Sequence, residues 1–170
     1  MGKILTEMRN TGIYKMITAL ILSLLMSGYS YAQSSNYKCM IQMNAYQGEA
    51  AYVVVSLIDA QGKYEKTLAV LGPDKQWYNT LKEWYKFQAK TKENLSAVTS
   101  ASIAGGDRAV KTISIEDAKL NKGYKLRFES AVEEQKYHTK DIEIPLTAEG
   151  LTQRASGSGY IRFVKLNKVQ

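Results

Sequence analysis

The sequence predicts a mainly β domain: an immunoglobulin-like antiparallel β-sandwich of about seven strands, with one amphipathic helix inserted after the third strand. Three observations lead to this fold class. Seven short segments alternate between apolar and polar residues, which is the period of a half-buried strand. Turn residues separate these segments at short intervals, and one segment has the period of a helix instead. Short alternating strands with frequent turns are typical of a two-sheet sandwich.

The strand segments differ in their patterns. Residues 51–59 carry β-branched side chains on both faces, so this strand is predicted to be central in its sheet. The turn Ala60-Gln61-Gly62 predicts a hairpin between it and the following strand. Pro145 indicates a strand that lies at a sheet edge or ends there. The seven predicted strands are residues 37–45, 51–59, 63–71, 110–116, 123–132, 137–146 and 160–166.

One segment changes from strand to helical period. Trp77, Leu81 and Trp84 stand at i, i+4 and i+7, which predicts a single amphipathic helix over about residues 74–89. We expect this aromatic stripe to pack the helix onto a sheet. The alternative is a ligand or partner surface formed by Trp77, Trp84 and Tyr85.

The boundaries of this helix follow from local chemistry. Gly72-Pro73 ends the preceding strand pattern, and Asp74 is a plausible N-cap because its side chain can accept a hydrogen bond from the first helical turn. Residues 91–109 after the helix are polar and small, and they form the longest irregular stretch of the predicted domain. Such loops carry function disproportionately often.

The first 32 residues have the three parts of a secretory signal peptide. Lys3, Arg9 and Lys15 give a positive start, and residues 16–26 are uncharged and apolar. Small residues before Gln33 provide the cleavage pattern. The apolar run is about half the length of a membrane-spanning helix, which needs about 20 residues. We therefore expect an exported, periplasmic or otherwise extracytoplasmic protein whose single domain is residues 33–170.

Composition narrows the function classes. The predicted mature part has 20 basic and 15 acidic residues, a net charge of +5, and both signs are interleaved along the chain. This pattern is typical of a solvated surface, so nucleic acid is not an expected partner. The one cysteine, Cys39, excludes an intramolecular disulfide. Its register in an alternating strand predicts a small buried core residue; a reactive thiol is the alternative.

The residue types needed for familiar catalytic sites are not assembled in recognisable motifs. His138 is the only histidine, so a Ser-His-Asp or Cys-His site has few possible members. We find neither a metal-ligand spacing, nor C-x-x-C, nor a phosphate-binding glycine loop. The paired carboxylates Glu116-Asp117 and Glu133-Glu134 stand at turn positions and are expected to be solvated. The sequence predicts no enzyme, although a hydrolase remains a third possibility.

The segment from Tyr52 to Val132 resembles a family of predicted periplasmic proteins of unknown function. The resemblance rests on the following segments: the strand Tyr52-Val53-Val54-Val55, the turn Asp59-Ala60-Gln61-Gly62-Lys63-Tyr64, Thr67-Leu68-Ala69, the helix with Trp77, Leu81 and Trp84-Tyr85, the run Val98-Thr99-Ser100-Ala101-Ser102, and Gly123-Tyr124. Members of this family are often encoded near flavin transferases and PepSY-type membrane proteins. The resemblance thus implies a membrane redox or PepSY-type protein as partner.

The same resemblance implies a possible cofactor. Flavin transferases of that neighbourhood attach FMN through a phosphoester to a Ser or Thr in a pattern resembling Asp-Gly-x-Ser/Thr-Gly-Ala-Ser/Thr. Residues 96–102 align with this pattern, with Ser102 as acceptor and Thr99 in the same loop. Ser96, Ala97 and Ser100 depart from it. Loops rich in Ser, Ala and Gly are also common without any modification.

Two functions follow from these observations. The first is a non-enzymatic exported accessory or binding protein, with no cofactor, associated with a membrane redox or transport system. The second is an extracytoplasmic electron-transfer flavoprotein with FMN attached covalently at Ser102.

Overall fold

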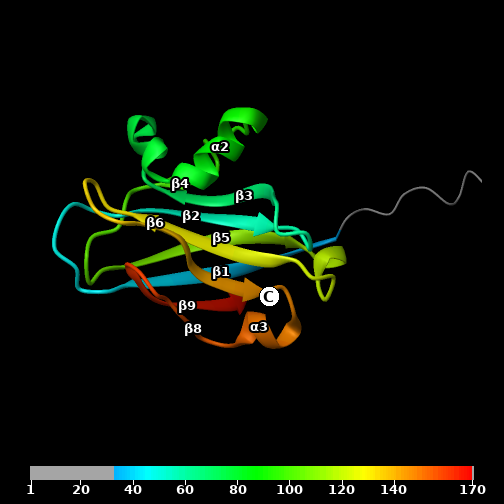
Figure 1. The fold of residues 1–170 in the computed structure, drawn as a ribbon. Helices are drawn as coiled ribbons and strands as arrows, with labels where there is room; N and C mark the ends of the chain where they lie inside the picture. Colours follow the sequence, from blue (N-terminus) through cyan, green and yellow to red (C-terminus); the bar gives the residue numbers. More distant parts are fainter. Residues whose placement is uncertain (1–32, 170) are drawn as a thin grey trace, which may run out of the picture. The chain divides into compact units, whose positions relative to one another are not determined.

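The computed structural model describes residues 33–169 (Figure 1). The predicted signal peptide lies outside the described residues. Within them, no helix has the length and apolar character needed to cross a membrane. The elements are β1 (Ser34–Met43), β2 (Tyr52–Ile58), β3 (Tyr64–Leu71), η1 (Lys75–Thr80), α2 (Lys82–Thr91), β4 (Thr99–Ser100), β5 (Arg108–Glu116), η2 (Asp117–Lys119), β6 (Lys125–Ala131), β7 (Tyr137–Pro145), α3 (Ala148–Thr152), β8 (Ala155–Ser156) and β9 (Ile161–Lys168).

The strands form two sheets, which confirms the predicted sandwich. One sheet has the order β5-β1-β9-β8 and the other the order β4-β3-β2-β6-β7. The seven predicted strands are all present. The described residues add two strands of only two residues each, β4 and β8. Pairing is antiparallel except between β3 and β4, which run parallel.

The predicted positions of individual strands are also confirmed. β2 is the middle strand of the five-stranded sheet and is buried on both faces from Val53 onward. It pairs with β3 as the expected hairpin. β7 is an edge strand, and Pro145 is its last residue, where its missing N–H disrupts no further ladder.

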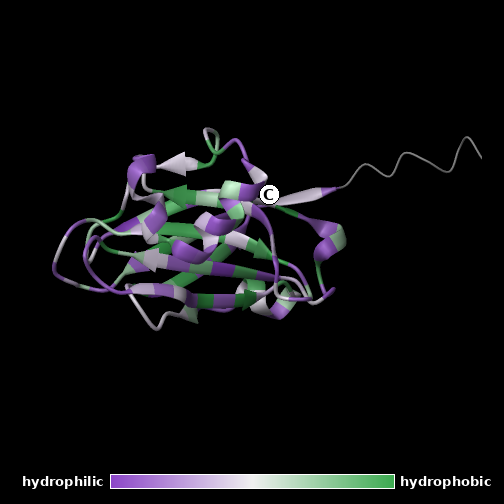
Figure 2. Cartoon of the chain, turned by 45° about the horizontal axis from the view of Figure 1, so that its top comes forward, coloured by the Kyte–Doolittle hydropathy of each residue, from purple (hydrophilic) through white to green (hydrophobic). Residues whose placement is uncertain are grey.

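The main core lies between the two sheets. Side chains of alternate residues on each strand point inward, and hydropathy accordingly changes in bands along the strands (Figure 2). Cys39 is fully buried among them, and burial raises the pKa of its thiol to about 12. The prediction that Cys39 is a core residue is confirmed.

The helical segment covers the outer face of the five-stranded sheet, above β2 and β3 in Figure 1. A second apolar cluster lies between the helical segment and this sheet. The helical part contributes Tyr78, Leu81 and Trp84, which are at most 4% exposed. The indole Nε1 of Trp84 donates a hydrogen bond of 2.9 Å to Thr67 Oγ1. Trp84 is therefore held by packing and by one buried polar contact.

The prediction of one continuous helix over residues 74–89 was wrong. Asp74 does cap the segment, accepting a hydrogen bond from the backbone N–H of Gln76, but the first part is the 3₁₀-helix η1. The backbone leaves helical geometry at Leu81, and α2 begins after it. A 3₁₀-helix has three residues per turn, so residues at i and i+3 share one side. The buried stripe is consequently Tyr78, Leu81 and Trp84, and Trp77 turns away from it.

Candidate functional site

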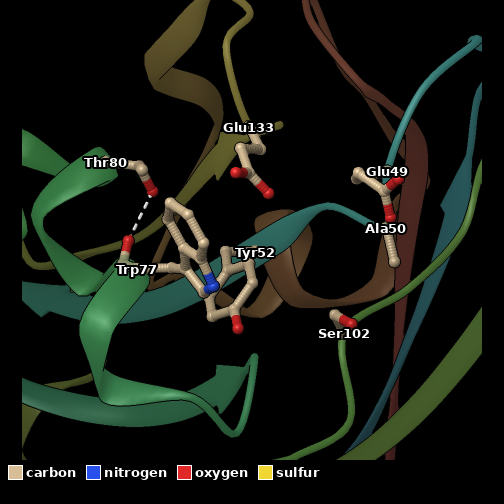
Figure 3. A pocket seen from close by; sticks show the side chains of 7 residues that line it. All are labelled: Glu49, Ala50, Tyr52, Trp77, Thr80, Ser102 and Glu133. Carbon is tan, nitrogen blue, oxygen red and sulfur yellow. Dashed lines mark hydrogen bonds between the residues drawn. The ribbon is translucent and has the colours of Figure 1, made fainter.

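A cleft of about 170 Å³ opens beside η1, and Trp77 forms part of its wall (Figure 3). We call it the Trp77 cleft. Its lining combines two aromatic residues, two acidic residues, one serine, one threonine and one alanine. The lining residues are Glu49, Ala50, Tyr52, Trp77, Thr80, Ser102 and Glu133. They come from the β1–β2 loop, the start of β2, η1, the segment after β4, and the β6–β7 loop.

Hydrogen bonds join the loops around the cleft to one another. Gln135 Nε2 donates a 2.8 Å bond to the carbonyl of Gln47, which joins the two loops that carry the carboxylates. Gly48, at φ +122°, lies against this amide, and a Cβ there would stand 2.2 Å from Gln135 Nε2. A side chain at position 48 would thus displace the end of the Gln135 side chain that makes this hydrogen bond.

A second set of hydrogen bonds holds the segment that carries Ser102. The hydroxyl of Tyr46 donates to the carbonyl of Ile103 at 2.8 Å and accepts from the N–H of Ala51 at 2.8 Å. Ala51 and Ile103 also exchange two backbone hydrogen bonds, of 2.9 and 3.1 Å. Ser102 is therefore placed beside the first residues of β2 by a short antiparallel bridge.

The two rings of the cleft are positioned by their neighbours. Gly72 has φ +149°, and a Cβ on it would lie 2.1 Å from Cδ1 of Tyr52, so the Tyr52 ring rests directly on the glycine backbone. The ring also meets Tyr78 in a T-shaped arrangement, with centroids 6.4 Å apart. Burial raises the pKa of Tyr52, and the charges of Asp74 and Glu133 act in the same direction. In η1, Thr80 Oγ1 donates a 2.7 Å bond to the carbonyl of Trp77 (Figure 3).

The structure separates the two residues of the predicted attachment loop. Thr99 lies in β4, and its hydroxyl donates to the carbonyl of Leu95 at 2.8 Å. Ser102 lies outside β4, is half-buried, and lines the Trp77 cleft. The hydroxyls of Ser96 and Ser100 are also hydrogen-bonded, whereas within residues 33–169 the Ser102 hydroxyl has no hydrogen-bond partner. Ser102 is thus the available hydroxyl of the segment.

The three aromatic residues predicted as a possible partner surface have different environments. Trp77 is half-buried in the cleft. Trp84 is fully buried, so it does not belong to a surface, and the expectation that the stripe packs the helix onto a sheet holds for this residue. Tyr85 is 43% exposed and borders a different depression, between α2 and the loop that follows it.

A buried titratable cluster lies beneath α2, apart from the cleft. Glu129 has no solvent exposure and accepts hydrogen bonds from the hydroxyls of Tyr64, at 2.6 Å, and Tyr137. Burial raises its pKa to about 7, and the two phenol hydrogen bonds hold it from rising further. The Arg127 guanidinium lies 5.2 Å from the centroid of the Tyr64 ring. The carboxylate is closed to solvent and does not line the Trp77 cleft.

A family model matches residues 34–163, from the start of β1 into β9. The family is described as "Predicted periplasmic protein (DUF2271)". The chain belongs to this family. As its description states, the protein is periplasmic. Among curated proteins and solved structures, nothing matches the chain.

The matched region of the DUF2271 chain contains every residue of the Trp77 cleft. Sequence reasoning found two of these residues, Trp77 and Ser102. It missed Tyr52 and Glu49, and it treated Glu133 as a solvated turn residue. The glycines at positions 48 and 72 were the available signal, because a glycine often marks a close approach to another residue. A single sequence does not reveal what each glycine approaches.

Proposed function

We propose that this periplasmic protein is a non-enzymatic binding protein, an accessory of a membrane redox or transport system, and that it engages its partner at the Trp77 cleft. The observation that carries the proposal is the half-buried indole of Trp77, which faces a cleft although its neighbours Tyr78 and Trp84 are packed in the core. Aromatic side chains that stay at a concave surface are typical anchors of recognition.

The construction of the cleft supports binding as its role. Its loops are joined by side-chain hydrogen bonds from Gln135 and Tyr46, so little conformational freedom is lost when a partner binds. The suggested partner is a PepSY-type or other membrane redox protein, in keeping with the resemblance described above.

Site-specific photo-crosslinking tests this proposal. A photoreactive phenylalanine analogue at Thr80, on the rim of the cleft, should give a discrete adduct with a membrane protein in intact cells. The same analogue at Val110, which is 58% exposed on β5, is the control for random collision. The Thr80 adduct should weaken when Trp77 is replaced by alanine. Equal adducts from both positions, or an adduct unaffected by Trp77→Ala, would contradict the proposal.

A second candidate is an electron-transfer flavoprotein with FMN esterified to Ser102. The specific observation in its favour is the hydroxyl of Ser102, which no described residue hydrogen-bonds and which lies in a cleft that also contains the rings of Trp77 and Tyr52. Against it, the carboxylates of Glu49 and Glu133 in the same cleft oppose the negative charge of a phosphoester.

Measuring the intact mass of the protein tests whether it is a flavoprotein. The chain is co-expressed with a flavin transferase and purified from the periplasm. Flavinylation predicts the added mass of one esterified FMN and yellow colour, both lost in Ser102→Ala and retained in Thr99→Ala. A colourless protein of unmodified mass would exclude it.

A further inference from the structure

We propose that the Trp77 cleft binds an organic ammonium group, presented either by a lysine side chain of the partner or by a free alkylamine. This inference deepens the proposed function, on which it rests, because it assigns a chemical class to the ligand of the same cleft.

The charged groups that line the cleft are acidic. Glu49 and Glu133 are its charged lining residues, and none of the Lys or Arg residues that the structure describes lines it. Neither carboxylate takes part in an ion pair or accepts a hydrogen bond from any residue of the range 33–169. The chain as a whole carries a net charge of +7. A negatively charged concavity in a basic protein favours a cationic ligand and disfavours an anionic one.

The aromatic rings are the second argument. Tyr52 and Trp77 both line the cleft, and Glu133 extends its carboxylate from the β6–β7 loop toward the side of the cleft where these rings lie (Figure 3). The face of an aromatic ring attracts a cation, most strongly for Trp, and quaternary and primary ammonium groups are bound in this way. The methylene groups next to the nitrogen would pack on the same rings.

The volume of the cleft selects the size of the ligand. Sites for drug-sized molecules and cofactors measure about 300–1,000 Å³. The Trp77 cleft, at about 170 Å³, is smaller. It suits the end of one side chain or a short amine.

The cleft is also built in advance of any ligand. The Gln135–Gln47 hydrogen bond joins the two loops that carry the carboxylates. The Tyr52 ring is held against Gly72. A site whose loops are already joined loses little conformational entropy on binding, which helps it to retain a ligand with a single charge.

Tryptophan fluorescence provides the test, because the chain has only two tryptophans and Trp84 is fully buried. The protein purified from the periplasm is titrated with N-acetyl-lysine methylamide and with n-butylamine. N-acetyl-norleucine methylamide is the neutral control, and butyrate is the anionic control. We expect a saturable change with the two amines, none with the controls, and loss of the signal in Trp77→Phe. A change that persists in Trp77→Phe, or equal responses to amine and neutral probe, would overturn the proposal.

Charge variants sharpen the test. Glu133→Gln and Glu49→Gln should each weaken amine binding by about fivefold, as expected for one partly exposed charge pair. Glu134→Gln removes the same charge from the next residue, which does not line the cleft, and should leave binding unchanged. Equal weakening in all three variants would indicate only a general surface effect and overturn the site.

The two sources of the ammonium group are separated by the order of affinities. Tighter binding of N-acetyl-lysine methylamide than of butylamine assigns the site to a partner's lysine, and the reverse order assigns it to a free amine. The result is independent of the crosslinking experiment. Loss of amine binding with a retained Thr80 adduct overturns the ammonium inference alone. If the amines bind but Thr80 gives no adduct, the proposed function is overturned and the ammonium site still stands.

Discussion

The hydroxyl of Tyr64 donates a 2.6 Å hydrogen bond to Oε1 of Glu129, a carboxylate with no solvent exposure in the centre of β6. Tyr137, on the neighbouring strand β7, donates to the other carboxylate oxygen. Glu129 thus links β6 to its neighbour β7 and, across β2, to β3. This arrangement makes Glu129 the group through which pH should act on the stability of the fold.

We expect the free energy of unfolding to decrease as the pH rises from about 4.5 to 7. The pKa of Glu129 is raised from 4.5 to about 7 in the folded protein, chiefly by burial. Between these values the folded state keeps a proton that the unfolded chain has released, so higher pH favours unfolding, by roughly 3 kcal/mol over the window. Urea unfolding at a series of pH values measures this dependence. Glu129→Gln should flatten it, while Glu149→Gln, which changes an exposed carboxylate on α3, should not. An unchanged slope in Glu129→Gln would contradict this assignment.

Trp84 and Tyr85 are adjacent, but they should differ sharply in their effect on stability. Trp84→Ala removes a fully buried ring and the hydrogen bond to Thr67, and should cost about 3–5 kcal/mol. Tyr85→Ala changes a side chain that is 43% exposed and should stay within about 0.5 kcal/mol. Urea midpoints of the two variants measure the difference. Comparable losses would mean that α2 packs through a different face.

Gly72→Ala should be more destabilising than Gly62→Ala, although both positions have positive φ. At Gly62 a Cβ meets nothing within 4 Å, so the variant measures backbone strain alone, about 1–3 kcal/mol. At Gly72 the Cβ would also collide with the Tyr52 ring, which must move. Combining Gly72→Ala with Tyr52→Ser should recover part of the loss, and a double-mutant cycle gives the coupling. Additive effects would show that the ring does not rest on this glycine.

Cys39 should be unreactive in the folded protein. Its side chain is fully buried, and its pKa of about 12 leaves almost no thiolate at neutral pH. Labelling with iodoacetamide at pH 8 should therefore require unfolding, and the rate should increase with urea in parallel with the unfolding transition. Rapid modification in the absence of urea would contradict the core position.

Much of the sandwich could be predicted because strand formation depends on a local pattern. Alternation of apolar and polar residues has a period of two, and it identified all seven long strands and the inward direction of Cys39. The apolar residues on both faces of β2 indicated that it is a central strand, and Pro145 indicated that β7 lies at the edge of its sheet. The helix was predicted less well. The spacing of Trp77, Leu81 and Trp84 fits an α-helix, but the 3₁₀ turn before Leu81 selects Tyr78 for the core.

The amino-acid sequence by itself determined the fold class, the order of the strands along the chain and the burial of Cys39, since each depends on periodicity over a few residues. The tertiary structure decided the composition of the Trp77 cleft. Its residues come from separate segments that meet only when β2 pairs with its neighbours, among them Glu49, Trp77, Ser102 and Glu133. Gln135 then lies against Gly48, and the Tyr52 ring lies against Gly72. Such contacts depend on long-range strand pairing and on backbone geometry at single glycines, and neither property has a local period that a sequence displays.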